Sequence, residues 1–163
     1  MWRSKAVIGL SLFFGLLLRP VTAQEADTVR FERLMGTLAQ AWSKQDTRLA
    51  LSCFSSDAVY MQPPDQQLYR GTAELEKLFG GLRPGTVMTF HTLAFDARKQ
   101  VGFGEFSFGS SGEPTADHGV VVVQLRDGRI ASWREYFESG PASFADFIGV
   151  DGKTWKWTVK DLR

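Results

Sequence analysis

The sequence predicts a single α+β domain in which three helices precede an antiparallel sheet. In the first half of the folded part, apolar side chains recur with the helical period of about 3.6 residues. Beyond Pro84 the period becomes about 2, which is typical of strands. Short turns separate these later segments, and those at 110–114 and 126–129 contain Gly. Consecutive strands are therefore expected to pair as hairpins, with the helices packed on one face of the sheet.

The first 23 residues have the pattern of a secretory signal peptide. Arg3 and Lys5 precede an apolar run at 6–18, and residues 21–23 supply small side chains for cleavage. The run is short for a membrane span, although an uncleaved anchor is the alternative. We expect a periplasmic or secreted protein with no stable membrane span after cleavage. The folded domain is expected at 24–140.

Charge and cysteine content exclude several classes of protein. The net charge is +1 and no basic stripe occurs, so a nucleic-acid partner is not expected. Cys53 is the only cysteine, which rules out an intrachain disulfide; its apolar setting predicts a core residue rather than a nucleophile. No metal-ligand spacing or phosphate-binding motif occurs. We therefore expect neither a metal nor another cofactor.

The helical part contains three amphipathic segments. Asp27 or Thr28 is expected to cap the first, and Asp46 the second. The third starts near Gly71–Thr72, after a short strand at 58–61 and a loop at 63–65. The inner face of the first helix holds Phe31, Leu34, Met35, Leu38 and Trp42, and that of the second holds Leu49, Ala50, Cys53 and Phe54.

Four strands are predicted in the second half, at 86–95, 100–108, 118–125 and 130–138. Asp127-Gly128 predicts a tight hairpin between the last two. Gly102, Gly104 and Gly109 fit bends that curve a sheet. A strongly curved sheet packed on helices leaves a ligand-sized pocket on its concave side. Residues 141–163 form a C-terminal extension, predicted as a short helix around Phe144, Phe147 and Ile148 and an edge strand with Trp155 and Trp157.

Alternation along the last strand predicts a carboxyl group in the pocket. Trp133, Glu135 and Phe137 share one face. A carboxyl group buried between aromatic rings is costly to ionise, and its raised pKa suits acid–base catalysis. The alternative is that this face points outward and Glu135 is solvated.

A second carboxyl group is predicted on the central strand, where Phe103, Glu105 and Ser107 share a face. Two carboxyl groups in one cavity would push their pKa values apart and give one acid and one base. Tyr60 and Gln62 share a face of the short strand and could orient a substrate oxygen or a water.

The two histidines are weaker candidates. His91 is more consistent with a core or sheet residue than with a catalytic one. His118 stands at the start of a strand, either as a turn residue or as a base at the mouth of the pocket.

Four stretches resemble the NTF2-like superfamily. The first three are Trp42 with Asp46, 53–60 and 69–75; the fourth, at 119–138, is similar to SnoaL-like polyketide cyclases and limonene-1,2-epoxide hydrolases. The resemblance covers roughly residues 28–140. It implies a cone-shaped fold, a deep apolar pocket and a homodimer. It does not fix an activity, because this fold serves enzymes and non-enzymes alike.

The epoxide-hydrolase resemblance carries over only in part. Tyr60 matches that family's pocket tyrosine, Gln62 stands at its asparagine, and Glu135 stands at its second aspartate. Glu105 falls where the family has an arginine, and Ser107 where it has the water-activating aspartate. Because Glu reverses the charge of Arg, epoxide hydrolysis by the family's route is not expected.

These observations predict a domain that binds a small hydrophobic molecule. If it is an enzyme, we expect cofactor-free acid–base chemistry: isomerisation, cyclisation, dehydration or hydrolysis. Glu135 or Glu105 would move the proton, and Tyr60 would donate to a developing oxyanion. The alternative is a non-catalytic binding or assembly module of the same fold. The predicted binding residues are Gln62, Ser107, Trp42, Phe103, Trp133 and Phe137.

Overall fold

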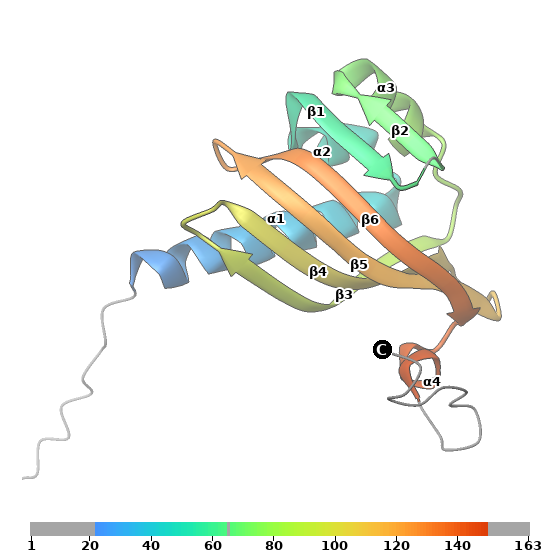
Figure 1. Ribbon diagram of the computed structural model, residues 1–163. Helices are drawn as coiled ribbons and strands as arrows, with labels where there is room; N and C mark the ends of the chain where they lie inside the picture. Colours follow the sequence, from blue (N-terminus) through green and yellow to red (C-terminus); the bar gives the residue numbers. More distant parts are fainter. Residues whose placement is uncertain (1–21, 65, 150–163) are drawn as a thin grey trace, which may run out of the picture.

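Six strands form one curved sheet that is covered on its concave side by helices, as Figure 1 shows for the computed structural model. The structure describes residues 22–64 and 66–149. The helices are α1 (Ala23–Lys44), α2 (Thr47–Ser52), α3 (Gly71–Gly80) and α4 (Phe144–Ile148). The strands are β1 (Phe54–Gln62), β2 (Gln67–Arg70), β3 (Thr86–Asp96), β4 (Val101–Ser110), β5 (Thr115–Arg126) and β6 (Arg129–Pro141). The predicted α+β cone, with three helices before the hairpins, is confirmed.

The strand order is β2-β1-β6-β5-β4-β3. The hairpins from β3 to β6 are antiparallel, as the turn residues predict. One pair differs from the prediction, because β1 runs parallel to β6. α3 and β3 to β5 lie between these two strands in the chain, so a long connection brings β1 beside β6 in the same direction.

Helix α1 begins earlier than its apolar face suggests. Its N-cap is Thr22, whose side chain accepts from the Glu25 backbone N–H, while the Glu25 carboxylate accepts from the Thr22 N–H at 2.7 Å. This capping box satisfies two backbone donors that the expected caps, Asp27 and Thr28, cannot reach. Those two residues lie inside the helix, where Thr28 bonds back to the Gln24 carbonyl.

The second helix is shorter than predicted, because Cys53 and Phe54 were expected inside it. α2 ends at Ser52, and Phe54 already belongs to β1, where it pairs with Ile130 of β6. A short edge strand, β2, was missed. Its four residues are polar enough to resemble a loop, and pairing with β1 is what makes them a strand.

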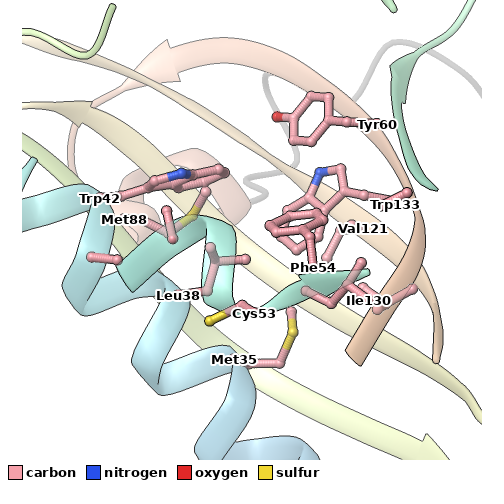
Figure 2. Close-up of a cluster of buried hydrophobic side chains, with 14 of the residues drawn as sticks. Met35, Leu38, Trp42, Cys53, Phe54, Tyr60, Met88, Val121, Ile130 and Trp133 are labelled. Atoms are coloured by element: carbon pink, nitrogen blue, oxygen red, sulfur yellow. The ribbon is translucent and has the colours of Figure 1, made fainter. Parts of the chain in front are cut away.

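The core is aromatic and lies between α1 and the sheet, as Figure 2 shows. Met35, Leu38 and Trp42 of α1 are at most 3% exposed and pack beside Trp133 of β6. The predicted core position of Cys53 is confirmed, since the side chain is 2% exposed and burial raises the pKa of its thiol. α1 approaches β4 so closely that a Cβ on Gly102 would lie 2.2 Å from the Phe31 ring.

Three predictions stay untested. The signal segment at 1–23 lies mainly outside the described residues, and the strand with Trp155 and Trp157 lies wholly outside them. The helical part of the C-terminal extension is present as α4. The homodimer stays a prediction. Within the described ranges, no helix is both long and apolar enough to span a membrane.

Candidate functional site

A cavity of about 320 Å³ opens on the concave side of the sheet, a size that suits a small organic ligand. Its wall combines aromatic and aliphatic side chains with a few polar groups. The lining residues are Trp42, Tyr60, Gln67, Tyr69, Lys77, Leu78, Gly81, Leu82, Met88, Phe106, Phe108, Asp117, Glu135 and Phe137.

Glu135 is the buried carboxyl group of this cavity. It points inward from β6 because it shares its face with Trp133, which is fully buried. The side chain of Glu135 is 6% exposed, and its Oε2 accepts a hydrogen bond from Trp133 Nε1 at 2.9 Å. Burial raises the pKa of Glu135; hydrogen bonding by Trp133 and Tyr60 opposes the shift, and the charge of Asp117 adds to it. Glu135 therefore holds a proton more readily than an exposed glutamate.

Tyr60 supplies a hydroxyl group beside this carboxyl. It lies opposite Trp133 in the parallel β1–β6 pair, and the two rings stack with centroids 5.7 Å apart. Burial raises the pKa of Tyr60 well above its usual value, and the negative charge of Glu135 raises it further. The phenol therefore stays protonated and available as a hydrogen-bond donor.

Trp42 adds an unused donor to the cavity wall. Its ring is 3% exposed, and its Nε1–H has no hydrogen-bond partner within the described part of the chain. Figure 2 shows the Trp42 and Trp133 indole nitrogens and the Tyr60 hydroxyl along the same edge of the aromatic cluster, away from Met35 and Cys53. A buried unpaired donor is costly, so a ligand oxygen accepting from Trp42 would remove that cost.

The structure brings together most of the predicted residues. Trp42, Tyr60, Glu135 and Phe137 line the cavity, and Trp133 lies directly beneath it. Gln62 lies on the inward face of β1 but outside this cavity, in a separate shallow pocket beside Pro63. The Gln62 side-chain nitrogen donates to Gln66, and its Oε1 has no partner within the described residues.

The expectation that Phe103, Glu105 and Ser107 share this cavity is wrong. They do share one face of β4, but it is the convex face, on which Phe103 is 46% exposed. The concave face of β4 carries Gly102, Gly104 and Phe106, because the Phe31 ring leaves no space for a side chain at Gly102. Glu105 accepts a hydrogen bond from the Thr92 hydroxyl at 3.3 Å on the convex face, so it cannot act in the cavity together with Glu135.

Sequence reasoning missed Asp117, which lines the cavity from β5. The predicted strand began at His118, three residues after the observed start at Thr115, so Asp117 was assigned to no face of the sheet. Asp117 shares its face with Val121, the cross-strand partner of Glu135. The pocket therefore holds two carboxyl groups, but the second is Asp117 rather than Glu105. Lys77 of α3 and Tyr69 of β2 were also missed, since their elements reach the cavity only through tertiary packing.

Among residues 22–64 and 66–149, no group of three or more His, Cys, Asp or Glu side chains is placed to hold a metal ion. The polar groups that line the cavity are of the kinds used in acid–base chemistry. A carboxyl with a raised pKa, a protonated phenol and a second carboxyl can move a proton and stabilise a developing oxyanion.

This combination of a curved sheet, three covering helices and an inward-facing polar cluster defines the NTF2-like class of pocket proteins. The chain belongs to the SnoaL-like domain family, whose model matches residues 36–133. No curated protein matches the sequence. Solved structures of similar fold include an epoxide hydrolase and a putative ketosteroid isomerase.

Solved structures with low sequence identity share the fold. An epoxide hydrolase of the limonene-epoxide-hydrolase type from M. tuberculosis is 19% identical, with a TM-score of 0.58 over 69% of this chain and 85% of that one. An NTF2-like protein of unknown function from Burkholderia xenovorans is 15% identical, with a TM-score of 0.60 over 80% and 96%. A protein from Catenulispora acidiphila with a ketosteroid isomerase-like fold is 16% identical, with a TM-score of 0.56 over 64% and 85%.

The raised pKa of Glu135 predicts a dependence of stability on pH. Because the folded protein binds this proton more tightly than the unfolded chain, the carboxyl contributes stability that is complete below about pH 4.5 and is lost as the pH rises through the folded-state pKa. Glu135→Gln removes this loss. Urea unfolding over a pH series should therefore show that, above pH 4.5, the free energy of unfolding of the variant rises relative to that of the wild type. Parallel curves for the two proteins would contradict the assignment.

Proposed function

We propose that this protein is a cofactor-free enzyme that moves a proton on a small, mostly apolar molecule carrying a carbonyl or hydroxyl oxygen. The observation that carries the proposal is Glu135, a carboxyl 6% exposed in the wall of a ligand-sized cavity and held by Trp133 Nε1. Such a group is expensive to keep in a purely structural role. The apolar lining favours an uncharged ligand body.

Each polar group has a role in this proposal. Glu135 exchanges the proton, because a raised pKa brings a carboxyl closer to the working pH. The Tyr60 hydroxyl and the free Trp42 N–H donate to the oxygen on which negative charge develops. Asp117 supplies the second carboxyl of an acid–base pair. These roles allow an isomerase, cyclase, dehydratase or hydrolase.

The test uses β-tetralone, an uncharged bicyclic ketone with acidic C–H groups next to its carbonyl. The proton exchange of this probe in D₂O is followed by NMR, and its binding by the fluorescence of the tryptophans at the cavity. Exchange faster than in buffer supports the enzyme. Binding without faster exchange would favour the other candidate, a ligand-binding module, to which the placement of Glu105 and Ser107 outside the cavity already points.

We also propose that the protein is exported. The support is the basic and apolar pattern of the first 23 residues. Expression in a bacterium with intact export machinery should yield a protein whose mass lacks those residues, recovered from the periplasm or the medium. A full-length protein in the cytoplasm would contradict the proposal. Cleavage after Ala23 would also remove Thr22, the N-cap of α1, and leave the buried face from Phe31 onward intact.

A further inference from the structure

A chain of hydrogen bonds crosses the convex face of the sheet, on the side opposite Glu135. His91 Nε2 lies 2.6 Å from Ser107 Oγ, and Ser107 Oγ lies 2.7 Å from His118 Nδ1. His118 Nε2 in turn lies 2.7 Å from the backbone carbonyl oxygen of Pro141. This series of hydrogen bonds therefore joins β3, β4 and β5 to the end of β6.

The direction of these bonds follows from the carbonyl at their end. A carbonyl only accepts, so His118 Nε2 carries a hydrogen, and in the neutral tautomer of this ring Nδ1 has a lone pair that can accept from Ser107. Ser107 therefore donates its hydroxyl hydrogen to His118 and accepts from His91 Nε2–H. Burial lowers the pKa of His91, which favours its neutral form, although the nearby Glu105 carboxylate opposes the shift.

The fold holds both imidazoles in place. The register of β3 against β4 shifts between Phe90 and Thr92, and this bulge turns the His91 side chain toward Ser107. Ser107 and His118 are direct cross-strand partners in β4 and β5. Helix α4 packs against both rings, although His91 itself stays exposed: Phe144 stacks on His91 at 3.7 Å and Phe147 stacks on His118 at 4.3 Å between centroids. His118 is 1% exposed as a result.

Ser107 remains accessible from one side. It lines a surface groove of about 290 Å³ with Val87, Thr89 and the turn at 109–112. Thr89 is the cross-strand partner of Ser107 in β3, and its hydroxyl makes no hydrogen bond with any described residue. The groove thus offers a serine, a base oriented by a carbonyl, and a free hydroxyl donor within one strand spacing.

We propose that Ser107 is the nucleophile of a second site, which takes small acyl groups from activated esters. Ser107 Oγ forms a bond to the acyl carbon while its proton passes to His118 Nδ1. The ester C–O bond breaks, and His118 returns the proton to the leaving alkoxide, which departs as an alcohol. Water then cleaves the acyl-serine to a carboxylic acid and restores Ser107. Thr89 and His91 donate to the oxygens that carry charge during these steps.

The test is covalent labelling of the folded full chain with a fluorophosphonate probe, read by intact mass and then by peptide mapping. We expect a single addition at Ser107, and a release of para-nitrophenol from para-nitrophenyl acetate that Ser107→Ala abolishes. Thr89→Val should slow the labelling by about 10²-fold, since it removes one donor to the oxyanion. Ser43→Ala, on the exposed face of α1, should label as the wild type does.

Each of these results tests the Ser107 site and is independent of the cavity that contains Glu135. No addition to the wild type, or an addition mapped to another residue, would overturn the proposal even if Ser107→Ala were to fold poorly. An unchanged labelling rate in Thr89→Val would overturn the role of that hydroxyl. A purely structural hydrogen-bond chain would lower the melting temperature of Ser107→Ala and give no labelled wild type, which also counts against the proposal.

Discussion

Replacing Glu135 by Gln is expected to lower the rate of proton exchange in β-tetralone by about 10²–10⁴-fold, the usual contribution of one positioned acid or base. Gln keeps the size of Glu and an oxygen that can accept from Trp133 Nε1. It cannot take or give the proton. Binding of the ketone, followed by tryptophan fluorescence, should change little, because the apolar walls around Tyr60 and Phe137 are untouched.

Glu105→Gln is the matched control for this experiment. It makes the same chemical change on the same sheet, but on the convex face, where the side chain bonds Thr92. Its exchange rate should equal that of the wild type. If both variants keep the wild-type rate, Glu135 has no catalytic role. If Glu105→Gln is the slower of the two, the placement of the reaction in the concave cavity is wrong.

Trp133→Ala should destabilise the protein by about 3–5 kcal/mol, as expected for removing a large, fully buried aromatic side chain. The ring packs against Trp42, Phe54, Tyr60 and Phe90, with centroids between 5.7 and 6.4 Å away. Its loss opens a cavity that four surrounding rings cannot readily fill. The free energy of unfolding in urea measures the effect.

Two further variants separate the roles of this tryptophan. Trp133→Phe keeps most of the packing but removes the N–H that bonds Glu135, so it should raise the pKa of that carboxyl further. Tyr136→Ala, on the same strand but 50% exposed, should change stability by only about 0.5 kcal/mol or less. A loss for Tyr136→Ala as large as that for Trp133→Ala would mean that the packing assigned to the concave face is wrong.

The candidate site was predictable to the extent that it follows alternation along one strand. Trp133, Glu135 and Phe137 were grouped correctly, since successive side chains of a strand point to opposite faces. The same rule grouped Phe103, Glu105 and Ser107 correctly but placed them on the wrong side. Of the β4 glycines expected to mark bends, Gly102 instead marks the face that helix α1 covers, because the Phe31 ring occupies the space of a side chain there.

Other parts of the site depend on partners distant in the chain. Asp117 enters the cavity because β5 starts at Thr115 and pairs there with the end of β6. His91 reaches Ser107 because of the bulge between Phe90 and Thr92, which no local residue pattern predicts. The parallel pairing of β1 with β6 sets the ring of Tyr60 against Trp133.

The amino-acid sequence was sufficient for the helices, the hairpins and the membership of each strand face, because these follow from local backbone geometry and short-range periodicity. It could not say which face of β4 is concave, which second carboxyl joins Glu135, or that two histidines meet at Ser107. Those outcomes depend on which surfaces pack together, and packing is decided between segments such as α1 and β4 that lie about half the chain apart.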